Sequence, residues 1–112
     1  MEAKYEQVGH ITVMLVEGDS LDASNAQEFK RAVAPVVAEH RQLIFDLSRL
    51  QFIDSSGLGA ILSCLRQLHA TGGDLKLCGM TKPVRVLFEL VRMHRIFDIH
   101  NTREDALQAF RP

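Results

Sequence analysis

Residues 52–59 read Phe-Ile-Asp-Ser-Ser-Gly-Leu-Gly, and this stretch decides the fold because it joins a buried strand to an amphipathic helix. Upstream, residues 43–47 (LIFDL) form a nearly continuous apolar run, which is typical of a strand covered on both faces. Downstream, large aliphatic residues recur at helical spacing and predict a helix that ends near residue 70: Leu58, Ile61, Leu62, Leu65 and Leu68. The Asp-Ser-Ser turn also has a purely structural explanation, since short oxygen-bearing side chains cap the free N–H groups of a first helical turn.

The two glycines are unusual so close to the start of a helix. Gly57 and Gly59 each cost about 1 kcal/mol relative to alanine in a helix. On a helical wheel the outer face begins with little side-chain bulk: Ser56, Gly59, Ser63 and Gln67. Two interpretations stay open, a surface that the backbone of another protein approaches closely and a tight packing contact between strand and helix.

Composition predicts one ordinary globular domain spanning residues 1–112. Thirteen Lys and Arg against fourteen Asp and Glu give a formal charge of −1, so no general attraction to nucleic acid or to anionic membranes is expected. The first residues lack a basic-then-apolar signal pattern, and no apolar run approaches the roughly 18 residues of a membrane span. We therefore expect a cytoplasmic protein without a nucleic-acid partner and without direct membrane insertion.

The cysteines and histidines predict no metal site and no cofactor. Cys64 and Cys78 are not part of a C-x-x-C motif, and we expect both to be buried, reduced thiols. No two of the five histidines are spaced i, i+3 or i, i+4, so ligands at metal spacing are missing from the sequence.

The first part of the chain predicts a hairpin followed by a helix. Residues 5–8 and 11–16 are strand-like, with Gly9-His10 as a tight connection. A polar loop follows at residues 17–22. The Ser-x-x-Gln spacing of residues 24–27 then predicts a capping box at a helix start. We expect Pro35 to kink or end this helix early, because proline removes one helical hydrogen bond.

The middle of the chain predicts a strand-helix-strand unit. The strand at 43–47, the helix after Ser55 and a strand at 75–78 would close as a crossover between two parallel strands. This arrangement places the turn at Asp54 beyond the carboxyl end of its strand, where open α/β sheets usually carry their sites.

Beyond residue 80 the sequence predicts two further helices and an edge strand. Thr81 is placed to cap a third helix with Pro83 in its first turn, and Thr102 is placed to cap the last one. Residues 96–99 are expected to add a short edge strand. Four cations of this region either form a basic patch or simply make a solvated face, which the balanced charge of the chain favours: Lys82, Arg85, Arg92 and Arg95.

The chemistry of the central motif argues against an enzyme. Neither a G-x-S-x-G elbow nor an evident histidine partner accompanies Ser55 or Ser56, and no G-K-[ST] is present to bind a nucleotide. A serine at a helix entrance is, however, a plausible kinase substrate. Phosphorylation would add a charge of about −1.5 to −2, which a helix N-terminus tolerates but a docked partner would oppose.

The motif at 52–59 resembles the signature of the STAS domain family, and within it of the bacterial anti-sigma factor antagonists. The spacing of the preceding strand, of Gly72-Gly73 and of Leu87-Phe88 agrees with this resemblance, which covers nearly the whole chain. It implies an α/β fold with a mixed β-sheet of four to five strands and about four helices, largely on one side of the sheet. It also implies that the protein has no enzymatic activity.

The same resemblance implies a partner-switching function. Ser55, directly after the aspartate of the motif, would be phosphorylated by an anti-sigma factor that is a serine kinase with a histidine-kinase-like ATPase fold. The unphosphorylated form would bind this kinase and release its target, and a serine phosphatase would reverse the modification. Asp22 and Asp54 would lie at the kinase interface near its nucleotide, and the contact would be lined by Ser56, Gly57 and Gly59.

The chain departs from the family pattern at two places. The loop at 18–22 is one residue longer than the usual Gly-x-Leu-Asp, and Val91-Arg92 replaces a Ser-Gly or Thr-Gly pair that is common near the end of the third helix. The alternative function is that of a STAS subunit of a membrane transporter complex, acting as a non-catalytic assembly or regulatory piece.

Overall fold

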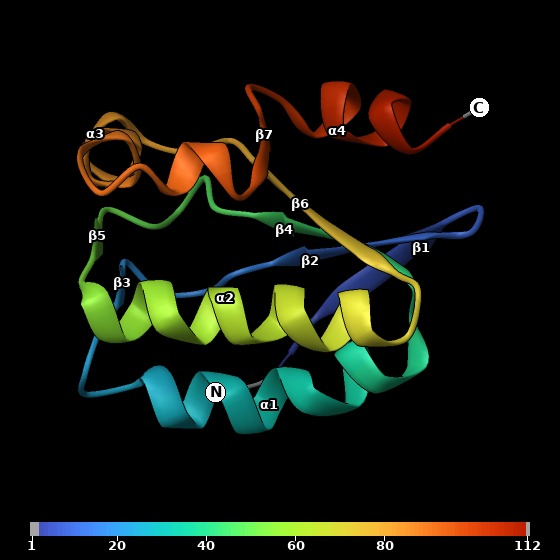
Figure 1. Ribbon diagram of the computed structural model, residues 1–112, viewed down its shortest axis with the longest axis horizontal. Coiled ribbons are helices and arrows are strands. Elements are labelled where there is room, and N and C mark those ends of the chain that lie inside the picture. The colour runs from blue at the N-terminus through green and yellow to red at the C-terminus, as the bar shows by residue number, and fades with distance from the viewer. Residues whose placement is uncertain (1–2, 112) are drawn as a thin grey trace.

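The structure is a computed structural model, and it describes residues 3–111. Strands and helices alternate along most of the chain (Figure 1). In chain order the elements are β1 (Tyr5–Val8), β2 (Ile11–Leu15), β3 (Ser20–Leu21), α1 (Ala26–Glu39), β4 (Gln42–Asp46), β5 (Phe52–Ile53), α2 (Ser55–Ala70), β6 (Asp74–Cys78), α3 (Lys82–Leu90), the 3-10 helix η1 (Met93–Arg95), β7 (Asp98–His100) and α4 (Arg103–Phe110).

The main sheet is mixed and has five strands in the order β1-β2-β4-β6-β7. β1 and β2 form the predicted antiparallel hairpin, and Gly9 adopts a positive φ of 65° in its turn. All later pairs in this sheet are parallel, and each crossover passes through a helix. The predicted parallel pairing of strand 43–47 with strand 75–78 is confirmed by the register Leu43↔Leu75.

Helices cover both faces of the main sheet. α1 and α2 lie side by side on one face, and α4 lies on the other (Figure 1). Val84 and Phe88 of α3 join the same core as the buried side chains of α1 and α2. The predicted arrangement, with four helices largely on one side of a five-stranded mixed sheet, is therefore confirmed.

β4 is the central strand of the sheet. Leu43 and Phe45 point into the larger core, whereas Ile44 points into a smaller cluster beneath α4. All three side chains are fully buried, which explains why this strand is apolar at successive positions. Phe29 of α1 packs edge-on against Phe45, with ring centroids 5.8 Å apart.

The start of α1 differs from the prediction. The capping box at residues 24–27 is not formed: the helix begins at Ala26, and Asn25 occupies the N-cap position without a side-chain cap. The Ser24 hydroxyl instead donates a hydrogen bond to the Asp22 carboxylate. The side chain of Asn25 is likewise committed to the preceding loop, where its oxygen accepts from the Asp22 N–H and its amide donates to the Ser20 carbonyl.

Of the two outcomes expected at Pro35, a kink or an early stop, the early stop does not occur. Pro35 lies inside α1, which continues to Glu39. The next two residues, Val36 and Val37, are buried in the main core. Their packing outweighs the single hydrogen bond that proline removes, because tertiary packing of an apolar face supplies most of the stability of a helix.

The two helices after residue 80 begin where they were predicted to begin, but only one of the two threonines caps its helix with its side chain. Thr102 caps α4 as expected, its hydroxyl accepting from the Asp105 N–H at 3.1 Å. Thr81 occupies the N-cap position of α3, but its hydroxyl donates to the Leu50 carbonyl and so ties α3 to the loop before β5. The edge strand lies at Asp98–His100 rather than at residues 96–99, because η1 and the buried Phe97 occupy the segment before it.

Both cysteines are buried and free, as expected. Burial raises the pKa of the Cys64 thiol to about 12 and that of Cys78 to about 11. Both side chains therefore behave as small apolar groups at neutral pH.

Arg103 of α4 connects the two ends of the chain across the sheet, and its contribution to the free energy of unfolding should depend on pH. Its guanidinium binds Glu6 of β1 and the Asp46 carboxylate of β4, the latter at 3.1 Å. Burial opposes ionisation of Asp46, but hydrogen bonds from Ser48 and Arg103 outweigh it and lower the pKa of this carboxyl below 3.8. Arg103→Met should reduce the free energy of unfolding at pH 7 by about 1 kcal/mol, since Arg103 is partly exposed.

Because the folded-state pKa of Asp46 is lowered, the stabilisation is present above pH 3.8 and is lost as the pH falls through the folded-state pKa. Urea titrations from pH 7 to pH 2 should therefore show the curves of wild type and Arg103→Met converging in acid. Arg111→Met is the matched control, because Arg111 reaches Glu104 only at 3.8 Å on the surface of the same helix. A pH-independent difference for Arg103→Met would contradict this account.

Candidate functional site

Asp54 organises the turn between β5 and α2. It is the N-cap of α2, and its Oδ1 accepts a hydrogen bond from the Gly57 N–H at 3.0 Å. Its Oδ2 accepts from the Ala23 N–H, also at 3.0 Å, across 31 residues of sequence. One carboxylate therefore caps the helix and holds the loop before α1 against it.

A two-stranded sheet strengthens the same junction. β3 pairs in parallel with β5, so that Leu21 lies opposite Ile53, and both side chains are buried. The Asp19 carbonyl accepts from the N–H groups of Gln51 and Phe52, at 2.8 and 3.1 Å. The loop before α1 and the entrance of α2 thus form one hydrogen-bonded unit at the carboxyl ends of the main strands, the end where α/β proteins place their sites.

Asp22 has a structural role inside this unit. Its Oδ1 accepts from both the hydroxyl and the N–H of Ser24, and these bonds lower the pKa of the Asp22 carboxyl. Its carbonyl accepts from the N–H groups of Asn25 and Ala26 and so opens α1. Asp22 is only partly buried, and its carboxylate stays ionised at neutral pH.

Ser55 and Ser56 occupy the first two positions of α2, and both are exposed. Among residues 3–111, neither hydroxyl makes a hydrogen bond. Within the same range their backbone N–H groups are also unpaired, whereas those of Gly57 and Leu58 bind Asp54. The entrance of α2 therefore presents two free hydroxyls and two free N–H donors to solvent.

The two glycines answer different requirements. Gly57 is buried, and a Cβ there would lie 2.2 Å from the Leu21 carbonyl oxygen. Gly57 thus allows α2 to approach β3, which is the tight packing contact between strand and helix that the sequence left open. Its expected place in a partner contact stays a prediction. Gly59 is exposed, and a Cβ there would meet no atom within 4 Å. Only Gly59 contributes to the low-bulk outer face of α2.

The site lacks the groups that serine chemistry needs. In the part of the chain that the structure describes, no histidine or other base is hydrogen-bonded to Ser55 or Ser56, and no cluster of His, Cys, Asp and Glu could hold a metal ion. Nothing in the described residues is therefore placed to activate either hydroxyl as a nucleophile.

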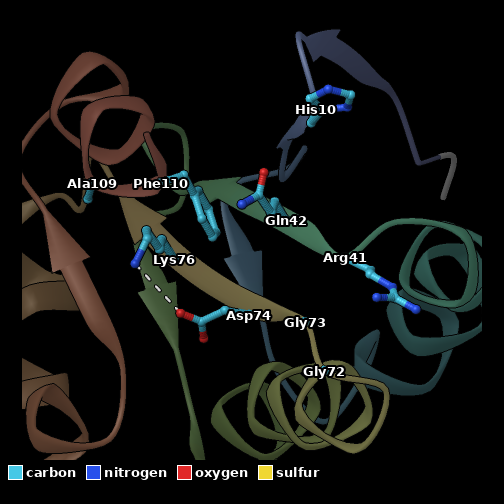
Figure 2. A pocket seen from close by; sticks show the side chains of 9 residues that line it. All are labelled: His10, Arg41, Gln42, Gly72, Gly73, Asp74, Lys76, Ala109 and Phe110. Atoms are coloured by element: carbon cyan, nitrogen blue, oxygen red, sulfur yellow. Dashed lines mark ion pairs between the residues drawn. The ribbon is translucent and has the colours of Figure 1, made fainter. Parts of the chain in front are cut away.

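A separate open pocket of about 610 Å³ lies at the opposite ends of the strands (Figure 2). Gln42 and Asp74, which line it, begin β4 and β6, whereas Ser55 follows the carboxyl ends of the sheet. The buried Lys76 ammonium at its wall is already paired with Asp98 at 2.5 Å and with Asp74 at 3.6 Å, and it lies 4.6 Å from the ring centroid of Phe110. The pocket is therefore distinct from the serine site. The charge of its Lys76 is balanced by carboxylates of the same chain.

The sequence did not indicate how the site is held together. The pairing of β3 with β5 and the bond from Ala23 to Asp54 both cross some 30 residues, and neither produces a periodic pattern. The one available signal was Leu21, an isolated apolar residue in a polar loop, which marks a buried position.

The chain is similar to known proteins along most of its length. The model of the STAS domain family matches residues 2–106. An anti-sigma-B factor antagonist of Listeria monocytogenes is 30% identical over 102 residues, which cover 90% of this chain and 88% of the relative. Within residues 3–111, no helix combines the length and the apolar character needed to cross a membrane.

Solved structures of anti-sigma factor antagonists are also similar to this chain. The crystal structure of an anti-sigma factor antagonist from Mycobacterium paratuberculosis superimposes with a TM-score of 0.87 at 25% identity, covering 98% of this chain and 93% of that one. SpoIIAA of Bacillus in its phosphorylated form shares the fold, with a TM-score of 0.70 at 24% identity and coverage of 97% and 99%.

The contrast between the two glycines gives a prediction. Gly57→Ala should reduce the free energy of unfolding by about 1 to 3 kcal/mol, because the new methyl group meets a backbone carbonyl that cannot move without disturbing β3. Gly59→Ala is the matched control and should raise it by up to about 1 kcal/mol, since alanine is the better helix former and the space is open. Chemical denaturation of both variants measures this difference. Equal changes in the free energy of unfolding would contradict the close approach of α2 to β3 at Gly57.

Proposed function

The chain belongs to the STAS domain family, and on this premise we propose that it is an anti-sigma factor antagonist whose activity is switched by phosphorylation of Ser55. Its relatives are anti-sigma factor antagonists, which are regulatory proteins. In this proposal the unphosphorylated chain binds an anti-sigma factor with a histidine-kinase-like ATPase fold, and the anti-sigma factor then releases its target.

The observation that carries the proposal is the state of the Ser55 hydroxyl. It is exposed and unbonded within residues 3–111, and it sits on a helix entrance that Asp54 holds rigidly. A kinase needs an acceptor that it can surround, and a pinned turn presents the hydroxyl without an ordering cost on binding. The phosphorylated form of SpoIIAA, a neighbour in fold, supports the same modification here.

The transfer requires nothing catalytic from this chain. The Ser55 oxygen attacks the γ-phosphorus of ATP held by the kinase, an O–P bond forms, and the bond from the γ-phosphorus to the β,γ-bridging oxygen breaks, so that ADP leaves. The hydroxyl proton passes to the kinase or to solvent. Because ATP is the phosphoryl donor, we place this chemistry in the cytoplasm; a serine phosphatase would restore the hydroxyl by hydrolysis.

The fold can carry the phosphate that this reaction creates. The unpaired N–H groups of Ser55 and Ser56 lie at the N-terminus of α2, where the helix dipole also favours an anion. The folded chain therefore tolerates a charge of about −1.5 to −2 that a partner docked on the same surface must desolvate. Phosphorylation thus weakens binding without unfolding the antagonist.

The remaining site residues divide into contact and positioning roles. We propose that Ser56 and Gly59, both exposed, touch the kinase, and that the ionised Asp22 lies at the edge of this contact near the nucleotide. Both oxygens of Asp54 are engaged inside the chain, so Asp54 is a positioning residue for Ser55.

The proposal predicts opposite results for two substitutions at one position. With a purified anti-sigma ATPase from the source genome and ADP, Ser55→Ala should bind within about threefold of wild type, because it keeps the low-bulk surface. Ser55→Asp should bind at least about 100-fold more weakly, because its charge must be buried against the partner. Calorimetric titration measures the affinities, and thermal unfolding should show that both variants stay folded.

Gln67→Glu is the matched control for added charge. It lies on the same helix 12 residues further on, about 18 Å away at 1.5 Å per residue, and should leave binding unchanged. If Ser55→Asp binds like wild type, Ser55 is only a helix residue and the switch does not exist. If no anti-sigma ATPase binds wild type and a transporter subunit retains all variants equally, the transporter alternative replaces the proposal.

A further inference from the structure

Nearly all the exposed large apolar side chains of the described chain lie at the end that carries Ser55. We call five of them the α3 patch: Phe52, Val86, Leu90, Val91 and Ile96. Leu90 is 76% exposed and Phe52 is 54% exposed. Tyr5 is the remaining exposed large apolar side chain within residues 3–111; it lies on β1 and packs against the ring of His40.

The backbone brings the α3 patch to one side of the molecule. α3 packs against both β5 and η1, and β5 leads directly into the start of α2 (Figure 1). Val86 and Leu90 are four residues apart and so share one face of α3. Thr81 ties the start of this helix to the Leu50 carbonyl at 2.7 Å, which fixes α3 relative to β5.

The end of α3 is also the place where the backbone is least ordinary. Arg92 has φ 61° and ψ 24°, and it is the only residue other than glycine with a positive φ among residues 3–111. This left-handed position after a helix is usually occupied by glycine. The chain accepts an arginine there, which places a cation directly beside Leu90 and Val91.

We infer that the α3 patch is a second contact for the anti-sigma factor and that it selects a partner whose facing surface is apolar with an acidic rim. The inference rests on the proposed function, because it places the patch in the interface around Ser55. A standard interface covers about 800 Å² on each partner, equivalent to a disc about 16 Å in radius. Phe52 lies three residues before Ser55, at most about 10 Å of chain away, so a partner that surrounds Ser55 reaches Phe52. The rest of the patch follows from there, because α3 packs against β5, the strand that carries Phe52.

The charges around the patch indicate the chemistry of that partner. Between residues 82 and 96 the chain has four Lys or Arg and one acidic residue, Glu89. The Arg85 guanidinium donates a hydrogen bond to the side-chain oxygen of Asn101 at 2.9 Å. The other three cations are exposed: Lys82, Arg92 and Arg95. Complementary acidic groups on the partner would meet these cations without steric obstruction.

The same charges disfavour a second copy of this chain as the occupant. A twofold dimer formed through the patch would bring together two copies of the same surface, on which cations outnumber acidic residues. Like charges placed opposite one another at an interface oppose association. A partner of different sequence fits this surface better.

Two variants test the inference in a titration with a purified histidine-kinase-like anti-sigma ATPase of the source genome, loaded with ADP. Leu90→Ser combined with Val91→Ser should weaken binding at least tenfold, since the apolar contact is lost. Arg92→Gly should weaken it about three- to tenfold at low salt and less at high salt, while the thermal midpoint stays equal or rises because glycine suits the positive φ. Tyr5→Ser is the matched control and should bind like wild type.

The outcomes separate this inference from the proposed function. If Ser55→Asp abolishes binding but both α3 variants bind like wild type, the patch lies outside the interface and the inference falls alone. Equal losses for Tyr5→Ser and the α3 variants would also overturn it. If sedimentation shows a wild-type dimer that the Leu90 and Val91 substitutions dissociate without changing ATPase affinity, the patch joins two copies instead. If wild type binds no anti-sigma ATPase, the proposed function fails and the inference fails with it.

Discussion

The carboxylate of Asp54 is the interaction on which the site depends. With one oxygen it caps α2, and with the other it holds the Ala23 N–H, so that two loops far apart in sequence become one rigid turn. A single N-cap contributes about 1 kcal/mol to stability, but here it also sets the direction in which the next residue points. Because Asp54 is engaged inside the chain, the groups left exposed at this turn are the hydroxyls of Ser55 and Ser56, and our proposal assigns Ser55 to the kinase.

This arrangement separates the stability of the fold from the control of binding. Buried contacts such as Leu21 with Ile53, and the close approach at Gly57, hold the entrance of α2 in place whether or not the serine is modified. A phosphate on Ser55 would meet free N–H groups and a favourable helix dipole, so its cost appears only when a partner covers it. A rigid domain that changes only its surface charge suits the reversible switch that we propose.

The sequence indicated the parts of this molecule that follow periodic patterns. The apolar run at 43–47, the aliphatic stripe of α2 and the Gly9 turn predicted the hairpin and the strand-helix-strand unit, whereas the family resemblance implied the mixed sheet with helices largely on one side. The predicted capping box at the start of α1 was wrong because Ser24 and Asn25 both suit a cap, yet their side chains instead bond within the loop that precedes the helix. The site residues were recognised from a motif, but the bond from Ala23 to Asp54 has no sequence signal.

Phosphopeptide mapping of the protein purified from its source cells, with phosphatases inhibited during lysis, tests the central claim most directly. The account predicts a phosphate on Ser55 in a fraction of the molecules and its disappearance when the anti-sigma ATPase is deleted. A phosphate confined to another residue, or a Ser55 that stays unmodified in every growth condition while its kinase is present and active, would contradict the account.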